Sequence, residues 1–246
     1  MPNTFVLTRR EVLRLFGAAG PFFFLGGRMT AGTLMPATNA VDHLLLGVAD
    51  LDHGIDWVER KTGVRPVVGG SHPGAGTRNA LISLGGRQYL EVIAPDPTQT
   101  VYTFPIDIRK LAEPRLVTWA SVTTDIDGRA KQAREAGSQV MGPLDGSRAR
   151  PDGKLLKWKT LRVTNQFGLQ GVEPVPFFIQ WAADSLHPSQ DSPKGCELQS
   201  FEIEHPDAER LTEVLKKLGI EAKVRRAGSA RLIATLKTPK GELQLS

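Results

Sequence analysis

Thiols are almost absent from this 246-residue chain, which has a single cysteine, Cys196. One cysteine excludes an internal disulfide, so cysteine content does not indicate the redox compartment. No histidine or asparagine signature of a thiol nucleophile surrounds Cys196. The sequence also lacks a phosphate-binding glycine loop, a dinucleotide-binding glycine fingerprint, a G-x-S-x-G motif and a CxxC pair. These absences argue against nucleotide-dependent, serine-hydrolase and thiol-redox chemistry.

Positive charge is in modest excess, with a formal net charge of +5. Residues 1–40 contain four arginines and one glutamate, a net +3, which leaves +2 for the rest of the chain. A nucleic-acid-binding protein would need a basic stripe interleaved with aromatic residues, and the sequence has none. The nearest basic runs, Lys216-Lys217 and Arg225-Arg226, are expected on the exposed side of a helix and an edge strand. We therefore expect no nucleic-acid partner.

Long hydrophobic runs are also missing, but a short one lies near the N-terminus. The uncharged stretch 15–27, about 13 residues, is too short to span a bilayer core of roughly 30 Å. It follows a basic segment at 8–14, and this order is typical of a secretory signal. The paired Arg9-Arg10 resembles a twin-arginine signal, from which Glu11 and Val12 depart.

We therefore assign residues 1–40 to a leader, with a cleavage site expected near Ala31 or Ala40. Ala40 is disfavoured, because the first strand follows it directly. The leader predicts export to the periplasm or secretion, with membrane contact only through the leader during export. The alternatives are an uncleaved membrane anchor, a simple amphipathic extension, or a cytoplasmic protein.

The remaining chain repeats a β-α-β-β-β pattern of short apolar strands and amphipathic helices. The first copy runs from a strand at 41–48 through a helix ending at Gly63 to a last strand at 88–94. ADLD at 49–52 aligns with TDID at 124–127, an offset of 75 residues (124 minus 49). A third copy opens at Glu197. These repeats predict an α+β fold in which residues 41–190 form two paired modules and residues 191–246 a third, partial module packed on them.

Four segments carry a family resemblance: VDHL at 41–44, GVRP at 63–66, GGSHPGAGTRNAL at 69–81 and YLEVIAP at 89–95. They resemble the bacterial glyoxalase-like domain proteins of the vicinal oxygen chelate superfamily, which includes glyoxalase I, extradiol dioxygenases and antibiotic-resistance proteins. The likeness is dense over 41–97 and looser over 115–188. It implies paired modules whose mixed sheets curl into a cleft, with a divalent metal on the concave face. A particular reaction does not follow from the fold.

Metal ligands in that superfamily come from the first and fourth strands of each module. The resemblance therefore implies that His43 and Glu91 are metal ligands and catalytic residues of the first module. Strand alternation agrees, because it turns Glu91 away from its neighbours Leu90 and Val92, which can face the helix.

In the second module the ligand pattern fails. The 75-residue offset places Thr118, a poor ligand, opposite His43 (118 minus 43), and Gln180 takes the fourth-strand position. His43, Glu91 and Gln180 would hold divalent Mn, Ni, Zn, Mg or Fe only weakly, with waters completing the coordination, unless His187 joins them.

Further side chains are predicted to bind the substrate. The guanidinium of Arg78 suits a carboxylate or phosphate, and a purely structural pair with Glu91 is the alternative. The other predicted substrate-binding residues, of which Trp119 equally fits a core position, are His72, Asn79, Tyr89, Thr118, Trp119 and His187.

An enzyme and a binding protein are the two main functions open at this point, and a scaffold with a vestigial pocket is the third alternative. As an enzyme, the protein would use a metal on His43 and Glu91 to polarise a small oxygenated acid in an isomerase or lyase reaction. As a binding protein, it would sequester a small molecule without a metal, which the lost ligands of the second module favour. A homodimer would complete the cleft if the internal repeats do not.

Overall fold

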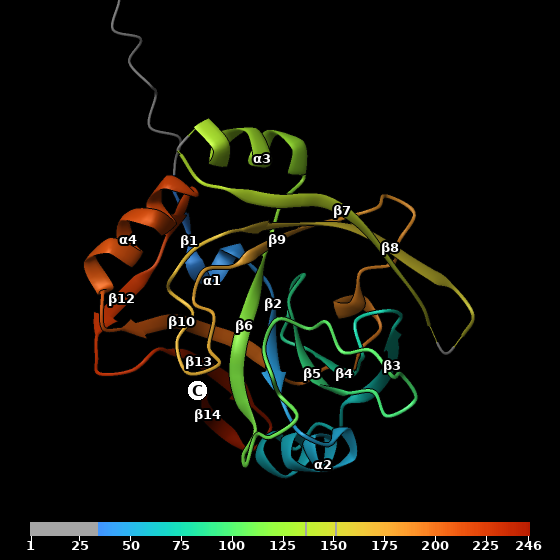
Figure 1. Cartoon of the computed structure of the whole chain (residues 1–246). Coiled ribbons are helices and arrows are strands. Elements are labelled where there is room, and N and C mark those ends of the chain that lie inside the picture. Colours follow the sequence, from blue (N-terminus) through green and yellow to red (C-terminus); the bar gives the residue numbers. More distant parts are fainter. Residues whose placement is uncertain (1–33, 136, 151) are drawn as a thin grey trace, which may run out of the picture. The chain divides into compact units, whose positions relative to one another are not determined.

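The computed structural model describes residues 34–135, 137–150 and 152–246 (Figure 1). The Arg9-Arg10 pair and Ala31, on which the prediction of export rests, lie outside the described residues. Among the residues described, none of the helices combines the length and the apolar character needed to cross a membrane.

Residues 35–40, which the sequence assigned to the leader, take part in the fold. Strand β1 (Met35–Pro36) pairs in parallel with β11 (Ile220–Glu221). Helix α1 (Ala37–Ala40) buries both of its alanines in the hydrophobic core. A cleaved leader therefore has to end before Met35 if this packing is to survive.

The first two modules together form one eight-stranded mixed sheet with the strand order β3-β4-β5-β2-β6-β9-β8-β7. Both modules have the same internal order and meet through their first strands, β2 and β6. The first consists of β2 (Val41–Gly47), α2 (Leu51–Thr62), β3 (Val67–His72), β4 (Thr77–Ser83) and β5 (Tyr89–Pro95); the second of β6 (Arg115–Val122), α3 (Ile126–Glu135), β7 (Val140–Ala149), β8 (Leu155–Val163) and β9 (Phe177–Trp181). The predicted α+β fold of repeated modules is confirmed.

Helix α2 begins and ends at residues whose local roles are visible in the sequence. The Asp50 side chain accepts the backbone N–H of His53 at 2.8 Å, which satisfies a free donor of the first turn. At the other end Gly63 adopts φ +82°, a left-handed conformation that ends the helix at little steric cost. Both signals act within a few residues, so no tertiary information is needed to read them.

The register between β2 and β6 relates the two modules by an approximate two-fold axis. These strands are antiparallel, and Leu44 pairs with Trp119, which lies 75 residues later (119 minus 44). The pair therefore lies on the axis. By the same register His43 has Thr118 as its counterpart, because each stands one residue before its strand's residue on the axis.

The eight-stranded sheet curls until its edge strands β3 and β7 lie side by side. A Cβ atom added at Gly70 on β3 would stand 2.9 Å from the carbonyl oxygen of Ala149 on β7. Helix α2 covers the convex face, since a Cβ at Gly54 would lie 2.8 Å from Val92 Cγ1 on β5. The concave face is left for side chains from both modules.

The third module follows the predicted β-α-β-β-β order but pairs its strands differently. Its four-stranded sheet has the order β12-β10-β13-β14, so the first strand lies between the second and third. In the other two modules the first strand borders the fourth. Its elements are β10 (Glu197–His205), α4 (Ala208–Lys217), β12 (Lys223–Arg226), β13 (Arg231–Thr238) and β14 (Gly241–Leu245). Phe201 on β10 packs edge-on against Trp119, with 5.0 Å between ring centroids, so this module shares its core with the large sheet.

Candidate functional site

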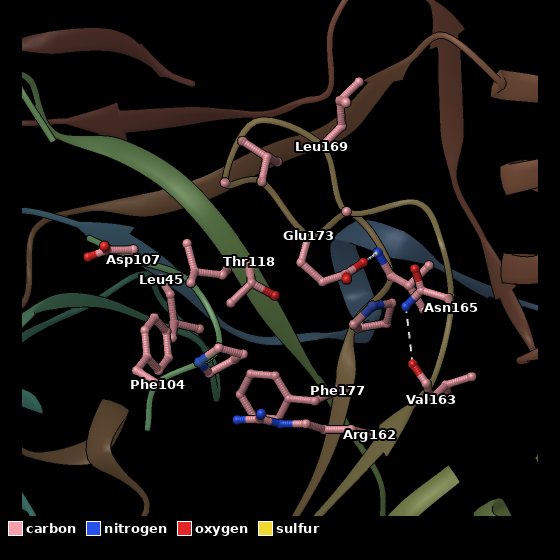
Figure 2. A pocket seen from close by; sticks show the side chains of 17 residues that line it. Leu45, Phe104, Asp107, Thr118, Arg162, Val163, Asn165, Leu169, Glu173 and Phe177 are labelled. Atoms are coloured by element: carbon pink, nitrogen blue, oxygen red, sulfur yellow. Dashed lines mark hydrogen bonds between the residues drawn. The ribbon is translucent and has the colours of Figure 1, made fainter. Parts of the chain in front are cut away.

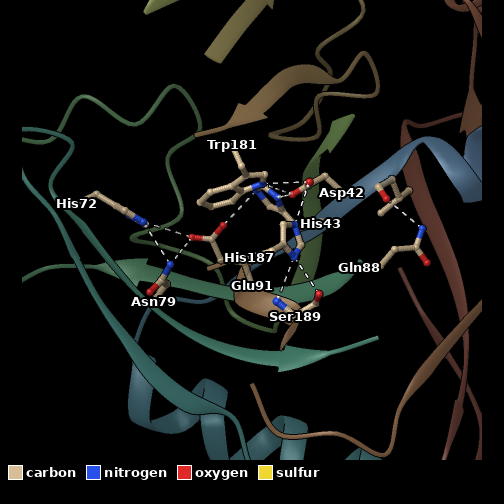
Figure 3. Close-up of polar contacts among 10 residues, drawn as sticks. Asp42, His43, His72, Asn79, Gln88, Glu91, Trp181, His187 and Ser189 are labelled. Carbon is tan, nitrogen blue, oxygen red and sulfur yellow. Dashed lines mark hydrogen bonds and ion pairs between the residues drawn. The ribbon is translucent and has the colours of Figure 1, made fainter. Parts of the chain in front are cut away.

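A cavity of about 440 Å³ lies on the concave face of the large sheet. The first module contributes His43 from β2 and Glu91 from β5, both labelled in Figure 3, and Tyr89 from β5. The neighbouring strands and the second module complete the wall, chiefly with His72, Asn79, Arg148, Phe177, Ile179 and Trp181. The two modules of one chain thus form the cleft, as the internal repeats allow.

Asp42 fixes the orientation of His43. Asp42 is only 1% exposed, and its Oδ1 lies 2.8 Å from His43 Nδ1. A carboxylate can only accept a hydrogen bond, so Nδ1 carries a proton and Nε2 is turned towards the cavity. This Nε2 lies 3.4 Å from Glu91 Oε2. The imidazole also stacks on the Tyr89 ring at 4.5 Å between centroids, which holds it in place.

Asp42 is itself held from behind the cavity. Its Oδ2 lies 3.2 Å from His187 Nε2 and accepts the indole N–H of Trp181 at 3.1 Å. Burial alone would raise the pKa of Asp42, but hydrogen bonds with His187 and His43 lower it to about 2. Asp42 therefore carries its negative charge at neutral pH and orients both rings.

Asn79 positions Glu91 from the other side. Its Nδ2 donates to Glu91 Oε1 at 2.7 Å and lies 3.2 Å from His72 Nε2. The NH₂ group of Asn79 has two hydrogens, so it can donate one to Glu91 Oε1 and the other to His72 Nε2. Burial lowers the pKa of His72, and the charge of Glu91 opposes this shift. What remains facing the cavity is the pair of His43 Nε2 and Glu91 Oε2, 3.4 Å apart.

Arg148 on β7 supplies a positive charge that the sequence analysis missed. Its side chain is 5% exposed, and within the described part of the chain its Nη1 has no hydrogen-bond partner. Burial lowers the pKa of Arg148, and the charge of Glu91 opposes this. A buried guanidinium with a free donor suits an anionic ligand group. Nothing in the sequence distinguishes Arg148 from Arg150, because only the curling of the sheet brings Arg148 to the cavity.

Gln180, predicted as a metal ligand, lies on the opposite face of its strand. Its Oε1 accepts the backbone N–H of Ile126 at 2.8 Å, at the start of α3. Its neighbours Ile179 and Trp181 line the cavity instead. Placing Gln180 in the cleft was therefore wrong, because side chains alternate between the two faces of a strand.

The register identifies the true counterpart of Glu91. Glu91 pairs with Leu45, and Phe177 pairs with Ala120. Ala120 follows Leu45 by the repeat offset of 75 residues (120 minus 45). Phe177 therefore occupies in the second module the position of Glu91 in the first.

Of the predicted substrate-binding residues, Arg78, Trp119 and His187 lie away from both this cavity and the one described below. Arg78 stands between Thr77 and Asn79, which line the cavity, so its own side chain points to the other face of β4. Trp119 is fully buried in the core and donates its indole N–H to a backbone carbonyl at 2.9 Å. His187 is fully buried behind Trp181, where it holds Asp42. The structure brings together His43, His72, Asn79, Tyr89 and Glu91.

The donor set does not fit the metal site that the resemblance implies. The first module offers His43 Nε2 and Glu91 Oε2, but the second has Thr118 and Phe177 at the corresponding positions. A phenyl ring has no donor atom. Across residues 34–135, 137–150 and 152–246, no three His, Cys, Asp or Glu side chains are grouped so as to hold a metal ion. The groups available for chemistry in the cleft are therefore its own side chains.

A second cavity, of about 410 Å³, adjoins the first (Figure 2). Leu45, Phe104, Arg162 and Phe177 border both cavities. Thr118, predicted to contact the substrate, lines this second cavity and not the first.

A model of the glyoxalase-like domain matches residues 41–219, which include both paired modules. The chain belongs to this family, within the vicinal oxygen chelate superfamily. The resemblance drawn from the sequence is thereby confirmed. No curated protein matches the chain.

Solved structures share the fold of this glyoxalase-like protein. A hypothetical protein from Staphylococcus aureus is 16% identical, with a TM-score of 0.62 over 78% of this chain and 87% of that one. A methylmalonyl-CoA epimerase from Mycobacterium tuberculosis is 21% identical, with a TM-score of 0.42 over 63% of this chain and 94% of that one.

Proposed function

We propose that the protein is an enzyme that moves protons on a small oxygenated acid, in an isomerase or lyase reaction. The observation that carries the proposal is the setting of His43. Asp42 holds one ring nitrogen, and the other faces the cavity beside Glu91. This is how a general base is oriented in proteins.

Each side chain of the cavity then has a distinct task. His43 Nε2 removes a proton from the carbon beside the acid group, and Asp42 stabilises the resulting imidazolium. Glu91 Oε2 accepts a hydrogen bond from the substrate hydroxyl, which keeps its proton, and the imidazolium returns a proton to the substrate carbon. Burial raises the pKa of Tyr89 well above its usual value, with Glu91 and Asp42 adding to the shift, so its phenol stays protonated. Arg148 binds the anionic group.

Proton exchange tests this function before the natural substrate is known. Small 2-hydroxy and 2-oxo acids are incubated with the protein in D₂O. NMR follows the loss of the signal from the C2 hydrogen of the 2-hydroxy acids and from the C3 hydrogens of the 2-oxo acids. We expect exchange with at least one acid, slowed by about 100-fold or more in His43→Gln. His53→Gln, an exposed histidine on α2, is the matched control and keeps the wild-type rate. Equal exchange in His43→Gln and wild type would reject His43 as the base.

A second function, metal-free sequestration of a small acid, is favoured by Thr118 and Phe177, which replace the metal ligands in the second module. A ligand that raises the melting temperature of wild type and His43→Gln alike, without proton exchange, would support it. Exchange by the wild type alone would support the enzyme.

We also propose that the protein is exported through the twin-arginine pathway, which the Arg9-Arg10 segment supports. Fractionation of cells and N-terminal sequencing of the mature chain test this. The mature chain is expected in the periplasm or medium, starting before Met35. An intact N-terminus in the cytoplasm would contradict it.

A further inference from the structure

The second cavity differs in chemistry from the first. Its wall carries mainly apolar side chains, among them Phe104, Ile106, Val163, Val172, Val175 and Phe177 (Figure 2). Both carboxylates of its wall already accept hydrogen bonds: Glu173 from the backbone N–H of Val175 at 3.0 Å, and Asp107 from the Arg109 side chain at 2.8 Å. A cavity of this volume with an apolar wall and few free polar groups suits a hydrophobic ligand group.

The two cavities correspond to each other through the two-fold axis of the sheet. Thr118 and Phe177 in the second cavity are the counterparts of His43 and Glu91 in the first. One half of the cleft thus carries acid–base groups, and the related half carries a hydroxyl and a phenyl ring. The two cavities share a border formed by Leu45, Phe104, Arg162 and Phe177, so one ligand can occupy both.

We propose that the substrate is an acid with an apolar tail. Its acid end lies beside His43, Glu91 and Arg148, and its tail passes Leu45 and Phe104 into the second cavity. The placement of the reacting end rests on the proposed function. The tail site rests on the apolar wall and the shared border.

Chain length is the variable that tests the tail site. The probes are straight-chain 2-hydroxy acids from three to ten carbons, with Kd measured by isothermal titration calorimetry. Burying one methylene in an apolar site tightens binding about fourfold. We therefore expect Kd to fall about fourfold per added carbon until the second cavity is full. Straight-chain alcohols of the same lengths, which lack the acid group, are expected to bind at least tenfold more weakly.

Thr118→Phe is the decisive variant, because it fills the second cavity and leaves the first unchanged. It is expected to bind the three-carbon acid like wild type and to lose the dependence on chain length. Thr118→Val is the matched control: it removes only the hydroxyl and keeps that dependence. If Thr118→Phe does not fold, Gly168→Leu replaces it. The nearest neighbours of a Cβ there would be the Glu173 carboxyl, at 3.2 Å, and a backbone carbonyl, at 3.9 Å.

The outcomes separate this inference from the proposed function. A Kd that does not change with chain length, or a dependence that survives in both cavity-filling variants, overturns the tail site even if acids exchange protons. A dependence on chain length in wild type and His43→Gln, without proton exchange in either, supports the tail site and removes the enzyme function.

Discussion

Replacing Asp42 by asparagine tests the network that orients His43. Asn has nearly the same shape, but an NH₂ group replaces one acceptor oxygen. Asp42 accepts from three rings, with 2.8 Å to His43 Nδ1, 3.2 Å to His187 Nε2 and 3.1 Å to Trp181 Nε1. In the variant the NH₂ group has to face at least one of these ring nitrogens. Either a buried N–H loses its partner or the proton moves to the other nitrogen of the histidine.

The cost can be worked out in two ways that describe the same interactions. Losing a charge-assisted hydrogen bond in a buried site costs about 1.5–3 kcal/mol. The pKa of Asp42 falls from 3.8 to about 2, which corresponds to about 2 kcal/mol of folding free energy. We expect Asp42→Asn to lower the free energy of unfolding by about 2–3 kcal/mol at pH 7. In a chain of this size that lowers Tm by roughly 4–12 °C.

The pH dependence makes the prediction specific. The folded-state pKa of Asp42 lies below its unfolded value of 3.8. Its stabilisation is therefore complete well above pH 3.8 and is lost as the pH falls towards 2. Wild type should lose about 1 kcal/mol of its advantage over Asp42→Asn between pH 5 and pH 3.

Urea unfolding at pH 7, 5, 4 and 3, followed by far-UV circular dichroism, measures this difference. Glu242→Gln, at an exposed carboxylate on β14, is the control and should track wild type within about 0.5 kcal/mol. An advantage of wild type over Asp42→Asn that stays constant from pH 7 to pH 3 would refute the assigned charge state of Asp42. Equal stability at pH 7 would refute the network itself.

Three further predictions test the corrected site. EDTA should change Tm by less than about 1 °C, measured by scanning fluorimetry, because His43 and Glu91 alone make a weak metal site. A large drop in Tm would support a bound metal after all. Gln180→Leu should lower Tm by roughly 2–4 °C, since α3 loses an N-terminal acceptor, and should leave proton exchange unchanged; loss of exchange would return Gln180 to the site. Thr118→His with Phe177→Glu should gain a Zn²⁺-dependent rise in Tm, and its absence in the folded variant would contradict the two-fold assignment.

Features set by neighbouring residues could be predicted from the sequence. The limits of α2 follow from Asp50 and Gly63, and the 75-residue repeat (124 minus 49) reappears in the pairing of Leu44 with Trp119. Glu91 could be placed in the cleft because Leu90 and Val92 frame it in a clear alternation.

Features that depend on pairing between distant strands could not be predicted from the sequence. The run from Phe177 to Trp181 is apolar on both sides of Gln180, so alternation does not show which residues face the cleft, and a shift of one residue exchanges the two faces. Arg148 reaches the cavity only because β7 curls round to β3. A sequence offset aligned on helix caps locates Thr118 correctly but not Phe177, because the segments between the strands differ in length in the two modules.

The pair on the two-fold axis explains how one half of the cleft can lose its ligands while the fold persists. Trp119 points into the core on the convex side, where it packs on Phe201 and donates to a backbone carbonyl. These contacts, with the strand hydrogen bonds, set the register of β6. Thr118 points to the concave side and takes no part in them, so its identity can change with little cost to the sheet. The sheet therefore leaves the polarity of each half of the cleft free to match the ligand. In the proposed complex, the acid–base half matches the acid end of the ligand and the apolar half matches its tail.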